Sequence, residues 1–403
     1  MTRERGMIAA FSAPWTRRMT GRDPEQPHRA STPLELLFDL CFVAAISQAA
    51  AQLAHGIEKD HVGPALLGFL LVFFAIWWAW MNFTWFASAY DTDDVPYRLL
   101  TLVQMAGVLV LAAGVPAALD HYDFTVATIG YAIMRVPGVL QWLRAAREDP
   151  ARRATCLRYA VGIAVVQVLW IARLALPHPW DIAGFVVLVV AELAVPIVAE
   201  LRGEPTTWHP EHIAERYGLF TLIVLGECVL GTTVAFQSAL GHGFSADLVL
   251  LAVGGLLLIF GLWWTYFLGG DDAGLTSLRA ALTWGYGHYL VFGSVAALGA
   301  GLEVAVQTSE HAAEIPEAVA GLAVAVPVAV FLVVISQLRR LTWPAGVLNH
   351  GFVAATAVLV LVCGALAGVI GLGPAVLAMG VVLGALLAAY FAVSHRRAVR
   401  ADG

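Results

Sequence analysis

Residues 74–80 read FAIWWAW, and residues 260–266 read FGLWWTY. Each copy of this aromatic motif ends a long apolar segment and leads into an acidic loop. In both loops an aspartate precedes an arginine by seven residues, as Asp91 precedes Arg98 and Asp272 precedes Arg279. The apolar run that begins at Glu35 likewise has a counterpart that begins at Glu215. This doubling predicts a protein built from two similar apolar halves.

The composition indicates that the solvent of these halves is lipid. Of the 403 residues, 60% are hydrophobic and only 13% are charged, whereas soluble domains carry about 25% charged residues. Polar residues could not cover this much apolar surface in water. The apolar runs are long and do not alternate with a period of two, so they predict helices rather than barrel strands.

The sequence predicts an all-α, polytopic membrane protein with about 12 transmembrane helices of roughly 20 residues each. The predicted spans are residues 34–54, 64–87, 98–119, 124–144, 155–175, 180–200, 217–239, 247–268, 280–302, 317–337, 347–369 and 374–394. Six spans precede the polar stretch near residue 205 and six follow it. An even number per half gives both halves the same orientation, which predicts a 6+6 parallel tandem repeat.

The predicted domains follow from this division. They are a cytoplasmic N-terminal arm at 1–33, a first six-helix half at 34–200, a linker at 201–213, a second six-helix half at 214–394 and a cytoplasmic tail at 395–403. The arm is polar and arginine-containing, without the apolar core of a signal peptide. We expect it to be flexible and to touch anionic lipid.

The basic residues predict the orientation. With twelve spans, all of the 23 Lys and Arg residues except Lys59, Arg173 and Arg135 lie on the side of the termini. The positive-inside rule therefore places both termini in the cytoplasm.

Ionisable residues near mid-membrane are the first candidates for function, because charges inside a span are costly and tend to face the protein interior. They are Arg135, Glu192, Glu227 and His288. An unpaired arginine at this depth is implausible, so Arg135 should pair with Glu227 or with Glu192. Such a pair would serve as a proton or ion relay or a substrate-charge site, or it would only orient the bundle.

A second layer of charges lies at the cytoplasmic ends of the predicted helices. It comprises Glu35, Asp39, Asp91, Asp93, Asp94, Arg98, Glu215, Arg216, Asp272 and Arg279. Because carboxylates near helix N-termini complement the helix dipole, this layer could be a belt of salt bridges and caps, or a paired gate. Glu35, Asp39, Arg216 and Glu227 could also line one polar path from the cytoplasm to mid-membrane.

Other features favour structural roles. The tryptophans of the aromatic motif predict an interfacial belt, with the walls of a central cavity as the alternative. The cysteines Cys41, Cys156, Cys228 and Cys363 have no metal spacing and read as small buried hydrophobes. His209, His212 and Glu215 form an H-x-x-H-x-x-E string, but Pro210 interrupts it, so we predict no metal. No Walker loop, nucleophile elbow or dinucleotide fingerprint is present, and we expect no cofactor.

Several strings resemble the bacterial low temperature requirement A family. They are TPLELLFDLCFV at 32–43, the WWAW run with YDTDD at 90–94, AERYGLF at 214–220, GE at 226–227 and WGYGH at 284–288. The likeness runs from about residue 31 to 394. The resemblance implies a polytopic inner-membrane protein of a family named for a growth requirement in the cold. It transfers no catalytic residues, although Glu35, Asp39, Asp91, Asp93, Asp94, Glu215, Arg216 and Glu227 occupy motif positions.

Three functions compete. The first is a proton-coupled secondary transporter or permease of a small solute, with Glu227 titrating and Arg135 as its counter-charge. The second is a non-transporting protein that supports the membrane in the cold by binding lipid or a partner. The third is a membrane-embedded lipid-modifying enzyme. The leading hypothesis is not enzymatic, and its partners are membrane lipids, a small solute and protons, with no nucleic acid. The oligomeric state stays open.

Overall fold

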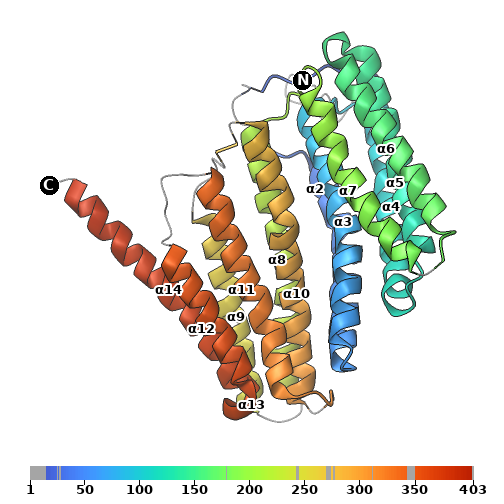
Figure 1. Cartoon of the computed structure of the whole chain (residues 1–403). Coiled ribbons are helices and arrows are strands. Elements are labelled where there is room, and N and C mark those ends of the chain that lie inside the picture. The colour runs from blue at the N-terminus through green and yellow to red at the C-terminus, as the bar shows by residue number, and fades with distance from the viewer. Residues whose placement is uncertain are drawn as a thin grey trace, which may run out of the picture. The chain divides into compact units, whose positions relative to one another are not determined.

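The computed structural model describes residues 15–24, 26, 29–177, 179–241, 245–268, 274–275, 277–310, 312–342 and 350–401. These residues form thirteen α-helices and one short 3-10 helix, and no strand occurs among them (Figure 1). The helices of the first part of the chain are α2 (Pro33–Glu58), α3 (Val62–Tyr90), α4 (Val95–Asp120), α5 (Thr125–Glu148), η1 (Pro150–Arg152), α6 (Arg153–Arg173) and α7 (Trp180–Leu201). The later ones are α8 (Pro210–Gly241), α9 (Ala246–Phe267), α10 (Leu278–Ser309), α11 (Glu317–Thr342), α12 (His350–Ala365), α13 (Ala367–Ile370) and α14 (Leu372–Ala401).

The all-helical, multi-pass character predicted from the sequence is confirmed. Each predicted span overlaps a helix, and within the described ranges nine helices are long and apolar enough to cross a membrane. The long helices α5 and α8 are not among these nine. Helix α5 carries Arg135 in its middle, and α8 carries Glu227. The segment predicted at 347–369 is divided into α12 and α13. The number of spans and the 6+6 repeat stay predictions.

The chain divides into two compact units. Unit 1 comprises Met1–Ala45 and Trp78–Ile213, and unit 2 comprises Ile46–Trp77 and Ala214–Gly403. The division falls inside α2 and α3, so each of these helices contributes one part to each unit. The sequence offered no signal for this, because both helices are continuous apolar runs.

In unit 1, α4 packs on α5, α5 on α6 and α6 on α7, and Figure 1 shows these helices side by side. Small residues allow the close approach of α4 and α5. A Cβ added to Gly130 would lie 2.3 Å from the backbone nitrogen of Leu111, which no side chain could tolerate. In lipid, such close backbone packing replaces the hydrophobic effect as the main source of helix association.

Unit 2 is held together in the same way. Its neighbouring pairs include α10 with α11, α11 with α12, α9 with α14 and α12 with α14. A Cβ added to Gly301 of α10 would lie 2.2 Å from the carbonyl oxygen of Ala323 in α11, and one added to Gly254 of α9 would lie 2.5 Å from the backbone nitrogen of Leu377 in α14.

The N-terminal arm differs from the expectation of a flexible segment. Its described part lies on unit 1, where the Arg17 backbone N–H donates to Asp94 at 2.8 Å and the Arg22 backbone N–H donates to Ala89 O at 3.0 Å. Arg29 is buried and donates to the carbonyl oxygens of Ala87 and Ser88. The arm therefore supplies partners for carbonyl groups at the end of α3, where the helix itself cannot.

The two copies of the aromatic motif have different surroundings. Trp77, Trp78 and Trp80 are buried in the protein core, so an interfacial belt is the wrong interpretation for them. In the second copy, Trp263 is 43% exposed and Trp264 is 47% exposed. The two similar aromatic motifs therefore lie in different surroundings, and the internal repeat stays a prediction.

Candidate functional site

Arg135 of α5 and Glu192 of α7 form a buried ion pair in unit 1. The guanidinium Nη2 lies 2.9 Å from Oε2 of Glu192, and the two residues are 5% and 1% exposed. Of the two partners that the sequence left open for Arg135, the structure gives Glu192.

Glu192 also accepts hydrogen bonds from three aromatic residues. The indole nitrogens of Trp78 and Trp170 donate from 2.8 Å and 3.1 Å, and the Tyr131 hydroxyl lies 3.4 Å away. Arg135 donates to the Tyr131 hydroxyl as well. Charge-assisted hydrogen bonds of this kind stabilise an ionised carboxylate. The pair is therefore a fixed, internally neutral element of unit 1.

Glu227 of α8 has a very different environment in unit 2. Its Oε1 accepts a hydrogen bond of 2.9 Å from the Ser47 hydroxyl of α2. Within the described part of the chain, no cation forms an ion pair with it. The side chain lies against α10 where Gly299 leaves room, because a Cβ on that glycine would lie 3.2 Å from Cγ of Glu227.

A further carboxylate, Glu303, lies in electrostatic range of both Glu227 and Glu58. Glu303 of α10 is half-buried and interacts with the charges of Glu58 and Glu227. It lies four residues after Gly299 and hence on the same face of α10. The sequence interpretation missed Glu303 because it ended the ninth span at residue 302, whereas α10 continues to Ser309. An acidic residue in an apolar flank was the signal available.

His288 of α10 is a satisfied core histidine. Its Nδ1 lies 2.7 Å from the carbonyl oxygen of Trp284, and its Nε2 lies 2.9 Å from the Tyr266 hydroxyl. Because a carbonyl group only accepts, Nδ1 carries the proton, and in the neutral ring Nε2 accepts from the hydroxyl. Both nitrogens are thus occupied by neighbours within unit 2.

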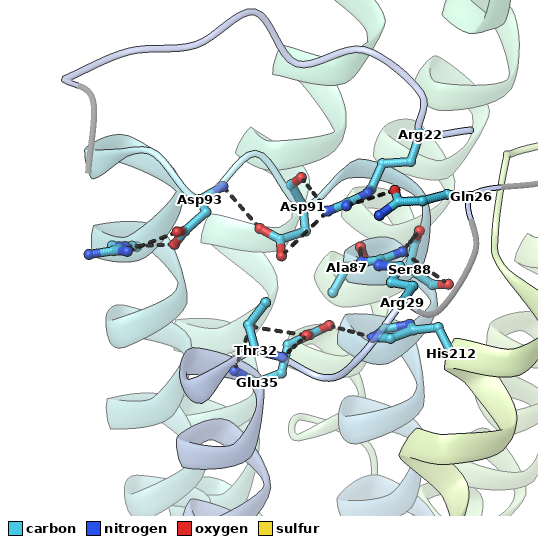
Figure 2. A network of polar contacts seen from close by, with 11 residues as sticks. Arg22, Gln26, Arg29, Thr32, Glu35, Ala87, Ser88, Asp91, Asp93 and His212 are labelled. Carbon is cyan, nitrogen blue, oxygen red and sulfur yellow. Dashed lines mark hydrogen bonds and ion pairs between the residues drawn. The ribbon is translucent and has the colours of Figure 1, made fainter. Parts of the chain in front are cut away.

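Figure 2 shows the polar cluster at the loop end of unit 1. Glu35 is fully buried, with Oε1 3.2 Å from Nε2 of His212 and Oε2 accepting from the backbone N–H and hydroxyl of Thr32. Arg22 lies 4.0 Å from Asp91. Burial raises the pKa of Asp91 to about 6, and the nearby Glu35 carboxylate adds to the increase against the opposing effect of the arm arginines.

The other carboxylates of this loop have their own partners. Asp93 pairs with Arg98 at 2.7 Å on the surface. Asp94 caps the N-terminus of α4 by accepting from Tyr97 N–H, and it pairs with Arg144 at 2.6 Å. Although burial opposes it, hydrogen bonds from Arg144 and from two backbone N–H groups lower the pKa of Asp94. These contacts are those of a capping and salt-bridge belt.

The structure places the remaining predicted residues separately. Asp39 is buried in unit 1 and accepts from the Trp80 indole at 2.7 Å. In unit 2, Glu215 is half-buried, Arg216 is fully buried and Arg279 is exposed. Asp272 lies outside the described residues. Because Glu35 and Asp39 belong to unit 1, and Arg216 and Glu227 to unit 2, the single polar path through all four stays a prediction.

The H-x-x-H-x-x-E string is engaged in local contacts. Nε2 of His209 lies 2.8 Å from the carbonyl oxygen of Gln26, while His212 faces Glu35. In the described ranges, no group of three or more His, Cys, Asp or Glu side chains is arranged to hold a metal ion. All four cysteines are free thiols; Cys156 and Cys228 are buried, while Cys41 and Cys363 are half-buried.

A helical bundle with ionisable groups inside apolar spans defines a multi-pass membrane protein. The family described as Bacterial low temperature requirement A protein (LtrA) matches residues 30–391, nearly the whole chain. The chain therefore belongs to the LtrA family, as the motifs in the sequence predicted. It is also similar to the Uncharacterized protein RA0937 of Rhizobium meliloti (strain 1021), with 29% identity over 306 residues, which cover 72% of each chain.

Proposed function

We propose that this protein is a proton-coupled secondary transporter of a small solute. The observation that carries the proposal is the pair of embedded carboxylates Glu227 and Glu303, for which no cation partner occurs among the described residues of unit 2. A carboxylate in hydrocarbon without a counter-charge is costly. Such a group is tolerated when it is protonated or only briefly ionised, and alternation between these forms can carry a proton.

The roles of the predicted residues change accordingly. Glu227 keeps its proposed role as the titrating group, and the Ser47 hydroxyl donates to its carboxylate. Arg135 is not assigned as its counter-charge, because Glu192 already neutralises that guanidinium. Glu303 and Glu58 are candidates for neighbouring proton acceptors. His288 is left out because both its ring nitrogens are occupied.

The packing order supports an internal repeat. In unit 1 the sequence of neighbours is α4–α5–α6–α7, and in unit 2 it is α10–α11–α12–α14. In unit 1 a hydrogen bond from Trp78 to Glu192 connects α3 with the last helix, α7. In unit 2 the corresponding contact is the packing of α9 on the last helix, α14. We infer that the halves are parallel repeats, and that movement of one half against the other gives alternating access. The basic residues support an inner-membrane location with both termini in the cytoplasm.

The test is transport by purified protein in vesicles. Solid-supported-membrane electrophysiology would screen classes of small solutes under an imposed pH gradient. We expect at least one solute to give a current that depends on the gradient. Glu227→Gln should abolish the dependence, because an amide cannot take up a proton, whereas Glu317→Gln, at an exposed carboxylate outside the cluster, should retain it. An unchanged, pH-dependent current in Glu227→Gln would overturn the assignment.

A non-transporting role in supporting the membrane is the second candidate. It is favoured by the loop end of unit 1, where Asp93 and Asp94 are held by Arg98 and Arg144 in a static arrangement. If this role is correct, no solute in the screen gives a current, and the protein instead binds anionic vesicles through its basic face.

A further inference from the structure

Unit 1 contains a small cavity among α2, α3, α4, α5 and α6. Its volume is about 30 Å³. Aromatic and aliphatic side chains form most of its wall, including Phe38, Phe83, Met134 and Trp142. The polar residues that line it are Asn82, Gln104, Arg135 and Gln141. The cavity is thus an apolar pocket into which a few polar groups converge.

Three of these polar residues have an atom that makes no hydrogen bond among the described residues. Nε of Arg135 is buried without a hydrogen-bond partner, although the guanidinium is otherwise bonded to Glu192. Gln104 donates through Nε2 to Gln141, which leaves its Oε1 free to accept. Asn82 donates through Nδ2 to the carbonyl oxygen of Trp78, which leaves its Oδ1 free as well.

Gln167 of α6 provides a second, independent observation. It is a buried residue, and neither Nε2 nor Oε1 has a partner within the described part of the chain. Gln167 lies one turn from Ile163, which lines the cavity, and about one turn from Trp170, which donates to Glu192. A buried amide without a hydrogen-bond partner is unfavourable, so Gln167 is a further polar group inside unit 1 whose hydrogen bonds the described side chains do not supply.

We propose that this cavity is a binding site for water at membrane depth. A buried water requires a polar site, two to four partners and roughly 10–15 Å³, so a volume of about 30 Å³ accommodates about two. Such waters connect the donor Nε of Arg135 with the acceptors Oε1 of Gln104 and Oδ1 of Asn82. The occupant is uncharged, because Glu192 already balances Arg135 and an ion would introduce a net charge.

Three methionines of equal exposure make the proposal testable within one molecule. Met134 lines the cavity, while Met81 and Met105 do not, and the three are 4%, 4% and 5% exposed. Hydroxyl radicals produced by X-ray pulses oxidise side chains that lie next to bound water. In the full-length protein in detergent, mass spectrometry should find Met134 oxidised several-fold faster than the other two.

Gly138 lines the cavity and has room for a Cβ. A Cβ at this position would meet only Oε1 of Gln104, at 4.0 Å. We expect Gly138→Val to reduce the oxidation of Met134 to the level of Met81, and Gly138→Ala to reduce it partly. Unchanged rates at Met81 and Met105 would show that both variants remain folded.

Equal oxidation of all three methionines in the unmodified protein would overturn the proposal, as would a fast rate at Met134 that persists in folded Gly138→Val. The cavity lies in unit 1, and the oxidation experiment uses neither a solute nor a pH gradient. The result of that experiment is therefore independent of the transport function proposed for the carboxylates of unit 2.

Discussion

The carboxylates inside the two units have opposite surroundings. In unit 1, Glu192 of α7 has a cation and three aromatic donors, and these four partners come from the three helices α3, α5 and α6. In unit 2, Glu227 has one hydroxyl donor, and Glu303 has other carboxylates nearby. The difference is that Glu192 is held in a fixed ion pair inside unit 1, whereas Glu227 and Glu303 of unit 2 have no cation partner among the described residues.

The largest expected effect comes from removing the same charge in each unit. Glu192→Gln leaves Arg135 as an unpaired cation in the membrane, so it should lower the free energy of unfolding by roughly 3–5 kcal/mol. Glu227→Gln removes no ion pair and should change it by less than about 1 kcal/mol. Denaturant titration in detergent micelles, followed by circular dichroism, measures both values.

A rescue experiment sharpens this result. Adding Arg135→Met to Glu192→Gln removes the stranded charge, and it should restore most of the lost stability. If Glu192→Gln proves as mild as Glu227→Gln, the two units do not differ in the way described, and the Arg135 pair contributes little.

The sequence was sufficient for the fold class, but not for the partners of the charged residues. Long apolar runs require helices in lipid, so the helices could be located from composition alone. The choice between Glu192 and Glu227 for Arg135 depends on which helices are neighbours, and spacing along one chain does not contain that information. Trp78, Tyr131 and Trp170 were missed as donors to Glu192 for the same reason. Gln104 and Gln167 were missed because only ionisable residues were taken as candidates. As polar amides in apolar segments, they were nevertheless visible in the sequence.

Asp91 gives the next effect in size, and it concerns the loop end of unit 1. Its pKa in the folded protein is raised to about 6 from an ordinary value of 3.8. The folded state therefore binds more protons than the unfolded state between these values, and stability falls as the pH rises from about 4 to about 6. One pKa unit corresponds to about 1.4 kcal/mol, so the loss is roughly 2–3 kcal/mol. Asp91→Asn should remove this component from a pH series of unfolding curves.

Asp94 provides the opposite sign in the same loop. Its folded pKa is lowered by Arg144 and backbone donors, so its stabilising contribution is present above the ordinary pKa of an aspartate and is lost at lower pH. Asp94→Asn should therefore weaken the protein at neutral pH, where Asp91→Asn strengthens it. Equal signs for the two variants would show that burial, rather than the arrangement of arginines, controls this loop.

The smallest effect tests the aromatic motif with the same substitution in its two copies. Trp78→Phe removes the indole donor of Glu192 while keeping an aromatic ring, and three other donors remain. We expect a loss of about 1–2 kcal/mol. Trp264→Phe changes a half-exposed ring of unit 2 and should stay within about 0.5 kcal/mol. Trp78 and Trp264 occupy the same position in the two aromatic motifs. A difference between the two losses of stability therefore measures how differently the two motifs contribute to their units. Equal losses would mean that the N–H group of Trp78 contributes little to stability, and that the three other donors are sufficient for Glu192.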